Sequence, residues 1–222
     1  MTPPVPERGL VLDSVAAALF DLDGTLVDSE PVHRAAWNSF FDSRGWEISD
    51  ETYAAHIVGR RGADAFRSLD GPWRDEDPEA LMAEVLTHQA TVDAEPGRIP
   101  GAAELVRTVH RAGVPIAVVT SALRAWVDEA LEFVGVADLV SVVVSAEDVS
   151  AGKPDPEGYL AACERLGVDP ANVVAFEDSV SGVTAAASAG VARVVGVLTT
   201  SQADALRAAG AHHIIDDLLD LT

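Results

Sequence analysis

Short, nearly continuous apolar runs recur along the chain, and stretches with a helical spacing of apolar positions separate most of them. Such runs indicate strands buried on both faces, which is typical of a parallel sheet covered by helices. The pattern therefore predicts an α/β protein with a Rossmann-like, doubly wound parallel sheet as its core. The predicted strands are residues 15–21, 114–121, 139–145, 172–178, 192–198 and 213–216. The predicted helices are residues 102–112, 124–134, 156–167, 179–189 and 203–209.

The interval between the first and second predicted strands is much longer than one crossover helix, which needs roughly a dozen residues. Residues 28–97 carry helical patterns and no convincing strand, and the sequence EPGRIPG ends them. We therefore expect a small α-helical cap domain at 28–97, inserted into a discontinuous core of residues 1–27 and 98–222. The linkers between the two are expected near residues 25–29 and 96–100.

Composition limits the classes of partner. The chain has 222 residues, of which 36 are acidic and 15 basic, so its formal net charge is −21. Nucleic acid and anionic membranes attract basic surfaces, so neither is expected as a partner, and the sequence suggests no obligate protein partner. The single cysteine, Cys163, is typical of a reducing compartment, and we expect a cytoplasmic protein. Residues 2–9 are expected to form a loose tail, and the short apolar run after them a strand rather than a signal peptide.

Polar side chains stand where the predicted core strands end. They are Asp21 and Asp23 after the first strand, Thr120 and Ser121 after the second, Lys153 beyond the third, and Glu177 and Asp178 after the fourth. In parallel sheets of this kind, ligands bind outside the carboxyl ends of the strands. Alternation along the first strand would bring the carboxylates of Asp21 and Asp23 together. Clustered carboxylates stay ionised when a cation joins them, and oxygen ligands favour Mg²⁺ before Ca²⁺ or Mn²⁺.

Other interpretations of these residues have less support. A calcium-binding EF-hand loop that began at Asp21 would need Gly at its sixth position, where Leu26 stands. Motifs of serine hydrolases, dinucleotide-binding proteins, P-loop proteins and zinc sites do not occur in the sequence. An Asx turn after a strand would also explain Asp23, and a helix cap would explain Asp178. The ordered set of polar strand ends favours a binding site over these separate explanations.

Lys153 is the one lysine among 15 basic residues, and it follows the third predicted strand. A compact ammonium group fits between a carboxylate and a phosphate where a planar guanidinium does not. This position favours a role in the predicted site, with an ordinary surface lysine as the alternative.

The segments FDLDGTLVDSE, VVTSA, AGKPDPEGY and FEDSVSGV, in that order, resemble the haloacid dehalogenase superfamily of phosphotransferases, in the subgroup with an inserted helical cap. The resemblance extends over about residues 15–200. The segments EPVHRAAW, IPGAAEL and VVGVLTT are similar to those of sugar- and polyol-phosphate phosphatases, with β-phosphoglucomutases close to them. The resemblance implies an Mg²⁺-dependent phosphatase that hydrolyses a small sugar or polyol monophosphate through a phosphoaspartate. The alternative is a phosphosugar mutase of the β-phosphoglucomutase type.

The same resemblance assigns roles to the polar strand ends. Asp21 is implied to be the nucleophile and a magnesium ligand, and Asp23 the general acid and base, which binds the metal through its backbone carbonyl. Asp178 is implied to be the third protein ligand, with Glu177 supporting the metal site. The implied phosphate-binding residues are Thr120, Ser121 and Lys153, and Lys153 is also counted as catalytic. We expect a raised pKa for Asp23 once the cap covers it.

The sequence pattern assigns roles to residues of the expected cap less specifically than to those of the core. His33 is expected near the hinge, where it would touch Asp23 or substrate, although a structural histidine fits the same pattern. Trp37 is expected to pack at the hinge. Arg60 and Arg61 lie between two predicted cap helices, where they would reach substrate hydroxyls or a second anion, or form a solvated surface pair.

Two other classes of protein remain as rivals. A signalling receiver domain also combines acids, Mg²⁺, Thr and Lys, but it has no insertion of this length after its first strand. A non-catalytic binding protein on the same fold would be expected to lack one of the four main site residues, which are all present. They are Asp21, Asp23, Lys153 and Asp178.

Overall fold

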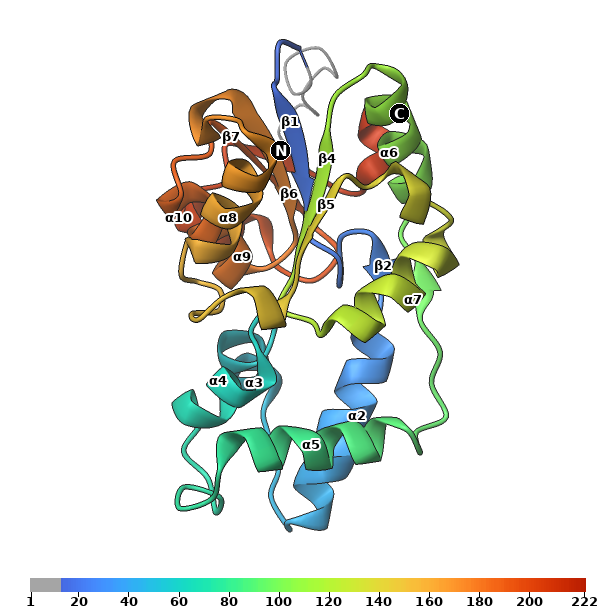
Figure 1. The fold of residues 1–222 in the computed structure, drawn as a ribbon. Helices are drawn as coiled ribbons and strands as arrows, with labels where there is room; N and C mark the ends of the chain where they lie inside the picture. Colours follow the sequence, from blue (N-terminus) through green and yellow to red (C-terminus); the bar gives the residue numbers. More distant parts are fainter. Residues whose placement is uncertain (1–12) are drawn as a thin grey trace.

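A computed structural model describes residues 13–222, so the tail expected at residues 2–9 lies outside the described residues. The predicted parallel sheet is present: six strands lie in the order β5-β4-β1-β6-β7-β8, and every neighbouring pair is parallel (Figure 1). The strands are β1 Ala17–Phe20, β4 Ile116–Val119, β5 Val142–Val144, β6 Val173–Glu177, β7 Arg193–Val197 and β8 His213–Ile215. Strand β1 therefore lies at the centre of the sheet, between β4 and β6.

Helices cover both faces of this sheet, as the doubly wound prediction requires (Figure 1). Helices α6 (Ala102–Arg111) and α7 (Arg124–Val134) pack on one face, and α8 (Glu157–Leu166), α9 (Val180–Ser188) and α10 (Ala203–Ala209) pack on the other. The side chains of β1 alternate between the two faces, and all four of its residues are fully buried. The short 3-10 helices are Ala137–Leu139, Ala146–Asp148, Pro170–Asn172 and Leu218–Leu221.

The first, second and fourth predicted strands extended past the observed strand ends by one or two polar residues. Strand β1 ends at Phe20, β4 at Val119 and β6 at Glu177, so Asp21, Thr120 and Asp178 lie just beyond the sheet. The register places Phe20 opposite both Val118 and Phe176, which sets these strand ends level with one another. The residues that follow leave the sheet at one edge and form the loops of the candidate site.

Four helices form a separate unit beyond the carboxyl ends of the strands (Figure 1). They are α2 Glu30–Ser43, α3 Asp50–His56, α4 Gly62–Ser68 and α5 Pro78–Gln89. Their core is largely aromatic, with Phe40, Phe41, Phe66 and Trp73 buried together. The expectation that Trp37 packs at the hinge is corrected: its ring lies 4.9 Å from that of Phe66 inside this core. The helical period places Trp37 on the same face of α2 as Phe40 and Phe41, which directs it into the core.

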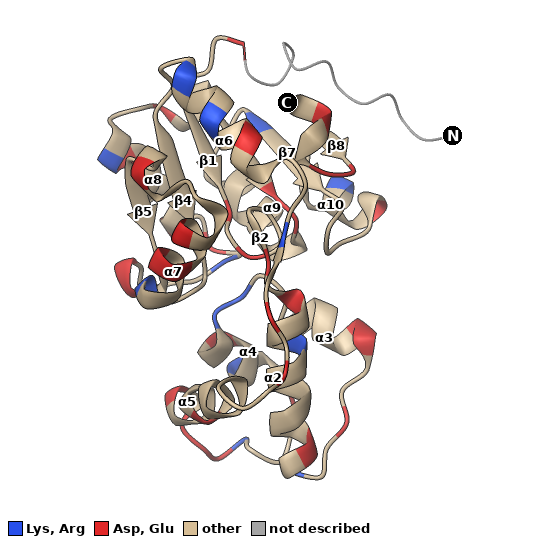
Figure 2. Ribbon diagram, turned by 90° about the vertical axis from the view of Figure 1, so that its right-hand side faces the viewer, with Lys and Arg blue, Asp and Glu red and all other residues tan. Residues whose placement is uncertain are grey.

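The chain passes between the two parts through a short antiparallel ribbon. Strand β2 (Val27–Asp28) pairs with β3 (Gly97–Arg98). The linkers were expected here, but the strands were not, because two-residue strands leave no alternating pattern to recognise. The domain limits of 1–27 with 98–222 and of 28–97 remain a prediction. Acidic residues are spread over both parts (Figure 2), which agrees with the strongly negative net charge.

Candidate active site

Asp21 stands directly after the central strand. Its backbone N–H donates to the carbonyl of Phe176 at 3.0 Å, which continues the ladder between β1 and β6 by one residue. The chain then turns sharply through Gly24, whose φ is +88°. A Cβ atom at Gly24 would lie 2.2 Å from Oδ2 of Asp178, so a side chain there would collide with this carboxylate. The turn thereby brings the loop after β1 against the loop after β6, and Asp21 is left only 5% exposed.

Three carboxylates meet at the ends of β1 and β6. Asp21, Glu177 and Asp178 each offer an oxygen within 4.8 Å of the others, and all three residues are buried. Thr25 donates from its hydroxyl to Oδ1 of Asp178 at 3.1 Å and orients that side chain. A buried set of carboxylate oxygens is the donor chemistry that a hard divalent cation such as Mg²⁺ requires. The described residues therefore fit the metal ion that the sequence implied.

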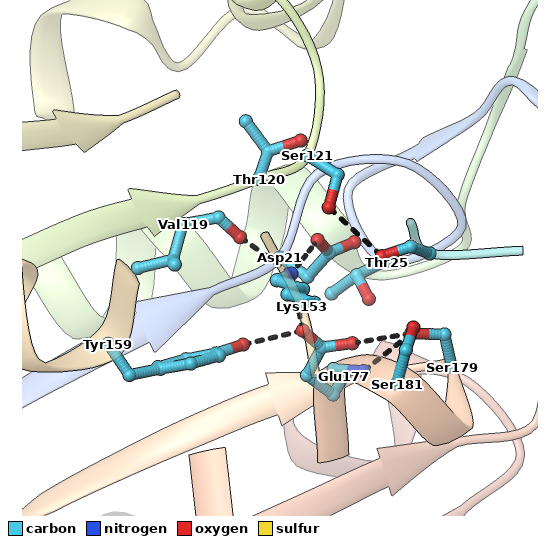
Figure 3. A network of polar contacts seen from close by, with 12 residues as sticks. Asp21, Thr25, Val119, Thr120, Ser121, Lys153, Tyr159, Glu177, Ser179 and Ser181 are labelled. Atoms are coloured by element: carbon cyan, nitrogen blue, oxygen red, sulfur yellow. Dashed lines mark hydrogen bonds and ion pairs between the residues drawn. The ribbon is translucent and has the colours of Figure 1, made fainter. Parts of the chain in front are cut away.

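Lys153 is buried against this cluster and is no surface lysine (Figure 3). Its Nζ donates to Oδ1 of Asp21 at 2.5 Å, to Oε1 of Glu177 at 2.6 Å and to the carbonyl of Val119 at 2.9 Å. All three donor positions of the ammonium are therefore used. Burial acts to lower the pKa of Lys153, but the charges of Asp21 and Glu177 outweigh it, so its pKa is raised and the side chain stays protonated.

Tyr159 is a site residue that sequence reasoning missed. Its hydroxyl donates to Oε1 of Glu177 at 2.6 Å, on the same oxygen that Lys153 binds (Figure 3). Ser179 donates to the other oxygen of Glu177 at 3.3 Å, and its hydroxyl also accepts from Gly182 N–H and so caps α9. Glu177 is thus held on both oxygens by side chains of the core, which favours a supporting position beside the metal site. Tyr159 lies on α8 and ends the segment AGKPDPEGY, but nothing in that segment indicates that its hydroxyl contacts Glu177.

Asp21 and Asp178 hold their protons more tightly than exposed acids do, because their pKa values are raised. Burial is the largest cause of the raised pKa of Asp21, and nearby Glu177, Asp178 and Asp23 add to it against the lowering effect of Lys153. Burial and the charge of Glu177 raise the pKa of Asp178 to about 7. Both shifts mean that the folded protein disfavours this concentration of negative charge, so a divalent cation would bind in exchange for protons.

The side chain of Asp23 is not one of the three carboxylates of the cluster, and the convergence of its carboxylate with that of Asp21 stays a prediction. Because β1 ends at Phe20, the alternation of a strand no longer applies at Asp23. Its Oδ1 instead accepts from the hydroxyl of Ser29 at 2.6 Å and from the indole N–H of Trp126 at 2.8 Å, and contacts Nε2 of His33 at 3.2 Å. The structure thus places His33 against Asp23. The role expected for the Asp23 backbone carbonyl remains a prediction.

The pKa of Asp23 is lowered, whereas the sequence-based expectation was a raised value. Burial acts to raise it, but the hydrogen bond and positive charge of His33 and the hydrogen bonds from Ser29 and Trp126 together outweigh burial. Donors that bind the charged form of a carboxylate lower its pKa. The expectation was wrong because it considered only the burial of Asp23 under the cap and omitted the hydrogen bonds that lower its pKa.

Thr120 and Ser121 follow β4 beside Lys153. These three residues line a small hollow together with Arg61, Gly152 and Tyr159. The Thr120 hydroxyl accepts from the Ala122 N–H at 3.0 Å, and the Ser121 hydroxyl donates to the carbonyl of Gly59 at 3.0 Å. Ser121 therefore contacts the loop between α3 and α4 in this conformation. The phosphate-binding role of both residues stays a prediction.

The loop between α3 and α4 rests on the core at several points. The carbonyl of Val58 accepts from Ser181 at 3.2 Å, beside the contact of Gly59 with Ser121. Arg61 donates to the carbonyls of Val149 at 3.3 Å and Ser150 at 3.0 Å, and pairs with Asp64 at 2.8 Å. The guanidinium of Arg61 is thus largely occupied by protein groups.

Arg60 differs from its neighbour in this loop. Among residues 13–222, its side chain has no hydrogen-bond or ion-pair partner. Arg60 is therefore the better candidate of the two for contact with a bound substrate, and the substrate-binding role of each arginine stays a prediction.

The fold and the site together define an α/β enzyme in which a buried aspartate directly follows the central strand and lies beside a lysine and two further acids. The model of the haloacid dehalogenase-like hydrolase family matches residues 15–190. The chain belongs to this family. Within residues 13–222, no helix combines the length and the apolar character that a membrane crossing needs.

Relatives that include phosphatases and a mutase match between 78% and 99% of the chain. Validoxylamine A 7'-phosphate phosphatase of Streptomyces hygroscopicus subsp. limoneus is 38% identical over 205 residues, 92% of this chain and 94% of the relative. Hexitol phosphatase A of Escherichia coli is 33% identical and covers 78% of each chain. The β-phosphoglucomutase of Mycobacterium bovis is 32% identical over 99% of this chain and 96% of its own. With phosphatases among these relatives, the chain is an enzyme of the phosphatase type.

A solved structure supports the same assignment of the fold. A hydrolase from Pseudomonas syringae superposes with a TM-score of 0.82 at 28% identity, over 93% of this chain and 95% of that one. Both the sheet and the inserted helical unit are therefore shared with enzymes of this family.

Replacing Gly59 by Ala is expected to separate the cap loop from the core. The φ of Gly59 is +70°, and an added Cβ would lie 2.2 Å from Oγ of Ser179. The left-handed backbone costs an L-residue about 1–2 kcal/mol, and the collision displaces the loop. A shift of about 1 Å at such a site can cost up to ~10²-fold in rate, so we expect kcat/KM for phosphate release to fall at least about tenfold.

Gly167 provides the matched control, because its φ is also +70° but nothing lies within 4 Å of an added Cβ. Gly167→Ala should lose thermal stability because of the same left-handed backbone strain as Gly59→Ala, but it should keep full activity. Equal activity in the two variants would show that the contact of Gly59 with the core is unimportant for turnover.

Proposed function

We propose that the protein is an Mg²⁺-dependent phosphatase that hydrolyses a small sugar or polyol monophosphate through a phosphoaspartate on Asp21. The observation that carries this proposal is the buried cluster in which Lys153 contacts Asp21 at 2.5 Å beside Glu177 and Asp178. A carboxylate in this setting is a nucleophile next to a fixed positive charge, and it adjoins oxygens that would hold a divalent cation. Those metal-holding residues would be Asp21 and Asp178, with Glu177 beside them.

The same residues of this chain act in both chemical steps of the proposed reaction. In the first step, an oxygen of Asp21 bonds to phosphorus while the bond to the leaving alkoxide breaks, and Asp23 gives the alkoxide a proton. In the second step, water attacks the phosphoaspartate, Asp23 accepts the proton of the water, and Asp21 is released with inorganic phosphate. Lys153 balances negative charge on the transferring group throughout. A bound Mg²⁺ would supply further charge neutralisation of the phosphate oxygens.

The lowered pKa of Asp23 has different consequences for the two steps. At neutral pH the side chain is ionised in the free enzyme, as a base for the water step must be. For the first step Asp23 must take up a proton. The negative charge of an arriving phosphate dianion favours that uptake, because a nearby like charge raises the pKa of a carboxylate.

The substrate class is supported by the names of the relatives. Hexitol phosphatase A and validoxylamine A 7'-phosphate phosphatase are phosphatases, and they match most of this chain. The similarity to a β-phosphoglucomutase over 99% of the chain favours a mutase as the second candidate. A mutase must also anchor a second phosphate. The guanidinium of Arg61 already binds core carbonyls and Asp64, so of these two arginines only Arg60 could anchor a second phosphate. This scarcity of cations favours water, rather than a second sugar hydroxyl, as the acceptor of the phosphoryl group.

The test is phosphate release from a panel of sugar, polyol and nucleoside monophosphates, with Mg²⁺ and with EDTA. We expect a hexose or polyol monophosphate to be turned over fastest, with free phosphate equal to substrate consumed and no release in EDTA. The proposal would be contradicted if no member of the panel released phosphate, or if phosphate release were unaffected by EDTA. Conversion of β-glucose 1-phosphate to glucose 6-phosphate, with a trace of bisphosphate and little free phosphate, would identify the mutase instead.

A further inference from the structure

Trp126 contacts the proposed general acid and base from a part of the fold that the mechanism does not otherwise use. It lies in the first turns of α7, and its indole Nε1 donates to Oδ1 of Asp23 at 2.8 Å. The ring also meets His33 edge to face, with centroids 6.4 Å apart and an interplanar angle of 78°. Trp126 therefore touches both members of the pair formed by Asp23 and His33.

Helix α7 holds the indole in place. Val127 and Leu131 of this helix are buried in the core, and the backbone N–H of Arg124 in its first turn donates to Glu147 at 2.7 Å. The other two partners of Asp23 have different origins, because Ser29 precedes α2 and His33 lies in the first turn of that cap helix. Trp126 is therefore the partner that the core itself supplies.

All three partners meet the same oxygen of Asp23. Ser29, His33 and Trp126 contact Oδ1, whereas no residue in the described range of 13–222 hydrogen-bonds to Oδ2. A carboxylate held this way cannot rotate without losing several hydrogen bonds, so its two oxygens are not equivalent. Oδ2 is the atom left to exchange a proton.

We propose that Trp126 is a positioning residue, whose indole N–H fixes Oδ1 of Asp23 so that Oδ2 faces the leaving-group oxygen and the attacking water. This inference rests on the proposed phosphatase function. Oδ2 gives its proton to the alkoxide as the phosphorus–oxygen bond breaks, and regains one from water as the phosphoaspartate is hydrolysed. Trp126 contacts Asp23 and not the reacting atoms, so it acts only through proton transfer by Asp23. Its effect on the rate should therefore be large only for a leaving group that must be protonated.

The experiment compares two leaving groups in the Trp126→Phe variant, which keeps an aromatic ring and removes the N–H. The substrates are p-nitrophenyl phosphate and the sugar or polyol monophosphate of the panel that is turned over fastest. A nitrophenolate leaves without protonation, whereas a sugar alkoxide needs a proton from Asp23. We expect kcat/KM to fall about tenfold for the sugar phosphate, which corresponds to the loss of one hydrogen bond to a charged group. For p-nitrophenyl phosphate we expect a fall of less than about twofold.

Trp46→Phe is the matched control. Trp46 packs against Phe41 and Trp73 in the cap core, at 5.0 and 4.9 Å between ring centroids, and has no contact with Asp23. This variant should leave kcat/KM for both substrates within about twofold of wild type. An equal loss on both substrates in Trp126→Phe, or no loss on either, would overturn the proposal.

A double variant separates this inference from the proposed function. If the indole acts through Asp23, adding Trp126→Phe to Asp23→Asn should reduce kcat/KM for the sugar phosphate by less than about twofold further. A full additional tenfold loss would show that Trp126 acts by another route. If the wild type releases no phosphate, or if Asp23→Asn is as active as wild type, the proposed function itself has failed.

Discussion

Asp21→Asn is expected to abolish phosphate release while the protein stays folded. The substitution removes the proposed nucleophile and one charged ligand of the proposed metal site, but it keeps nearly the same volume at a position that is 5% exposed. Loss of the covalent route should lower kcat by more than about 10³-fold. Phosphate release under saturating substrate and Mg²⁺ measures the effect. Activity above about a tenth of wild type would contradict the assignment of Asp21 as the nucleophile.

The same variant should also change how stability depends on pH without Mg²⁺. Because burial and neighbouring acids raise the pKa of Asp21, the folded state binds this proton more tightly than the unfolded state does. The resulting stabilisation is complete below the unfolded pKa, about 4, and is lost as the pH rises through the folded pKa. Asn has no proton to lose. The Tm of Asp21→Asn relative to wild type should therefore increase with pH.

Asp204→Asn is the control for these measurements. Asp204 is fully exposed and its partner Arg207 lies 3.4 Å away. This variant should match wild type in activity and in the pH dependence of Tm. A Tm difference for Asp21→Asn that falls with pH would show that Lys153 stabilises the Asp21 carboxylate more than burial destabilises it.

Removing the ammonium of Lys153 is expected to cost both stability and activity. Lys153→Met leaves the buried acids Asp21 and Glu177 without the cation that lies 2.5 and 2.6 Å from them. Breaking a buried ion pair at one partner typically costs about 3–5 kcal/mol. We expect a loss of this size in urea unfolding at pH 8 without Mg²⁺, together with a fall in kcat/KM of at least about 10²-fold.

Lys153→Arg should also lose most activity although it keeps the charge. The planar guanidinium is larger than the ammonium and must fit a site that is 7% exposed, with the ring of Tyr159 5.5 Å from Nζ. Full activity in this variant would show that charge alone is needed. Arg207→Met, which breaks an exposed pair, is the control and should change stability by at most about 1 kcal/mol.

The core sheet could be predicted because its strands must be apolar on both faces. Ala17 to Phe20 are all fully buried, two on each side of the sheet, so the run itself indicates its environment. The positions of Asp21, Lys153 and Asp178 in one site followed from the same argument, since parallel strands place their carboxyl ends at one edge. The β2 and β3 ribbon was not predictable, because pairing of two-residue strands depends on where the two linkers meet.

The environment of Asp23 could not be predicted in the same way. Its contact with Trp126 joins residues 103 positions apart, and it exists only because α7 packs against the sheet. The contact of Tyr159 with Glu177 depends on the placement of α8 in the same manner. Side chains on helices become site residues through packing, which leaves no local pattern in the sequence.

The sequence by itself therefore determined where the strands lie along the chain, the presence of an inserted helical unit and the set of polar residues at the strand ends. These features depend on local apolar patterning, which each segment carries on its own. The tertiary structure alone decided that Lys153 is shared between Asp21 and Glu177, and that the Asp23 carboxylate accepts from Trp126. Protonation and orientation depend on burial and on partners from distant segments, and these exist only once the helices have packed against the sheet.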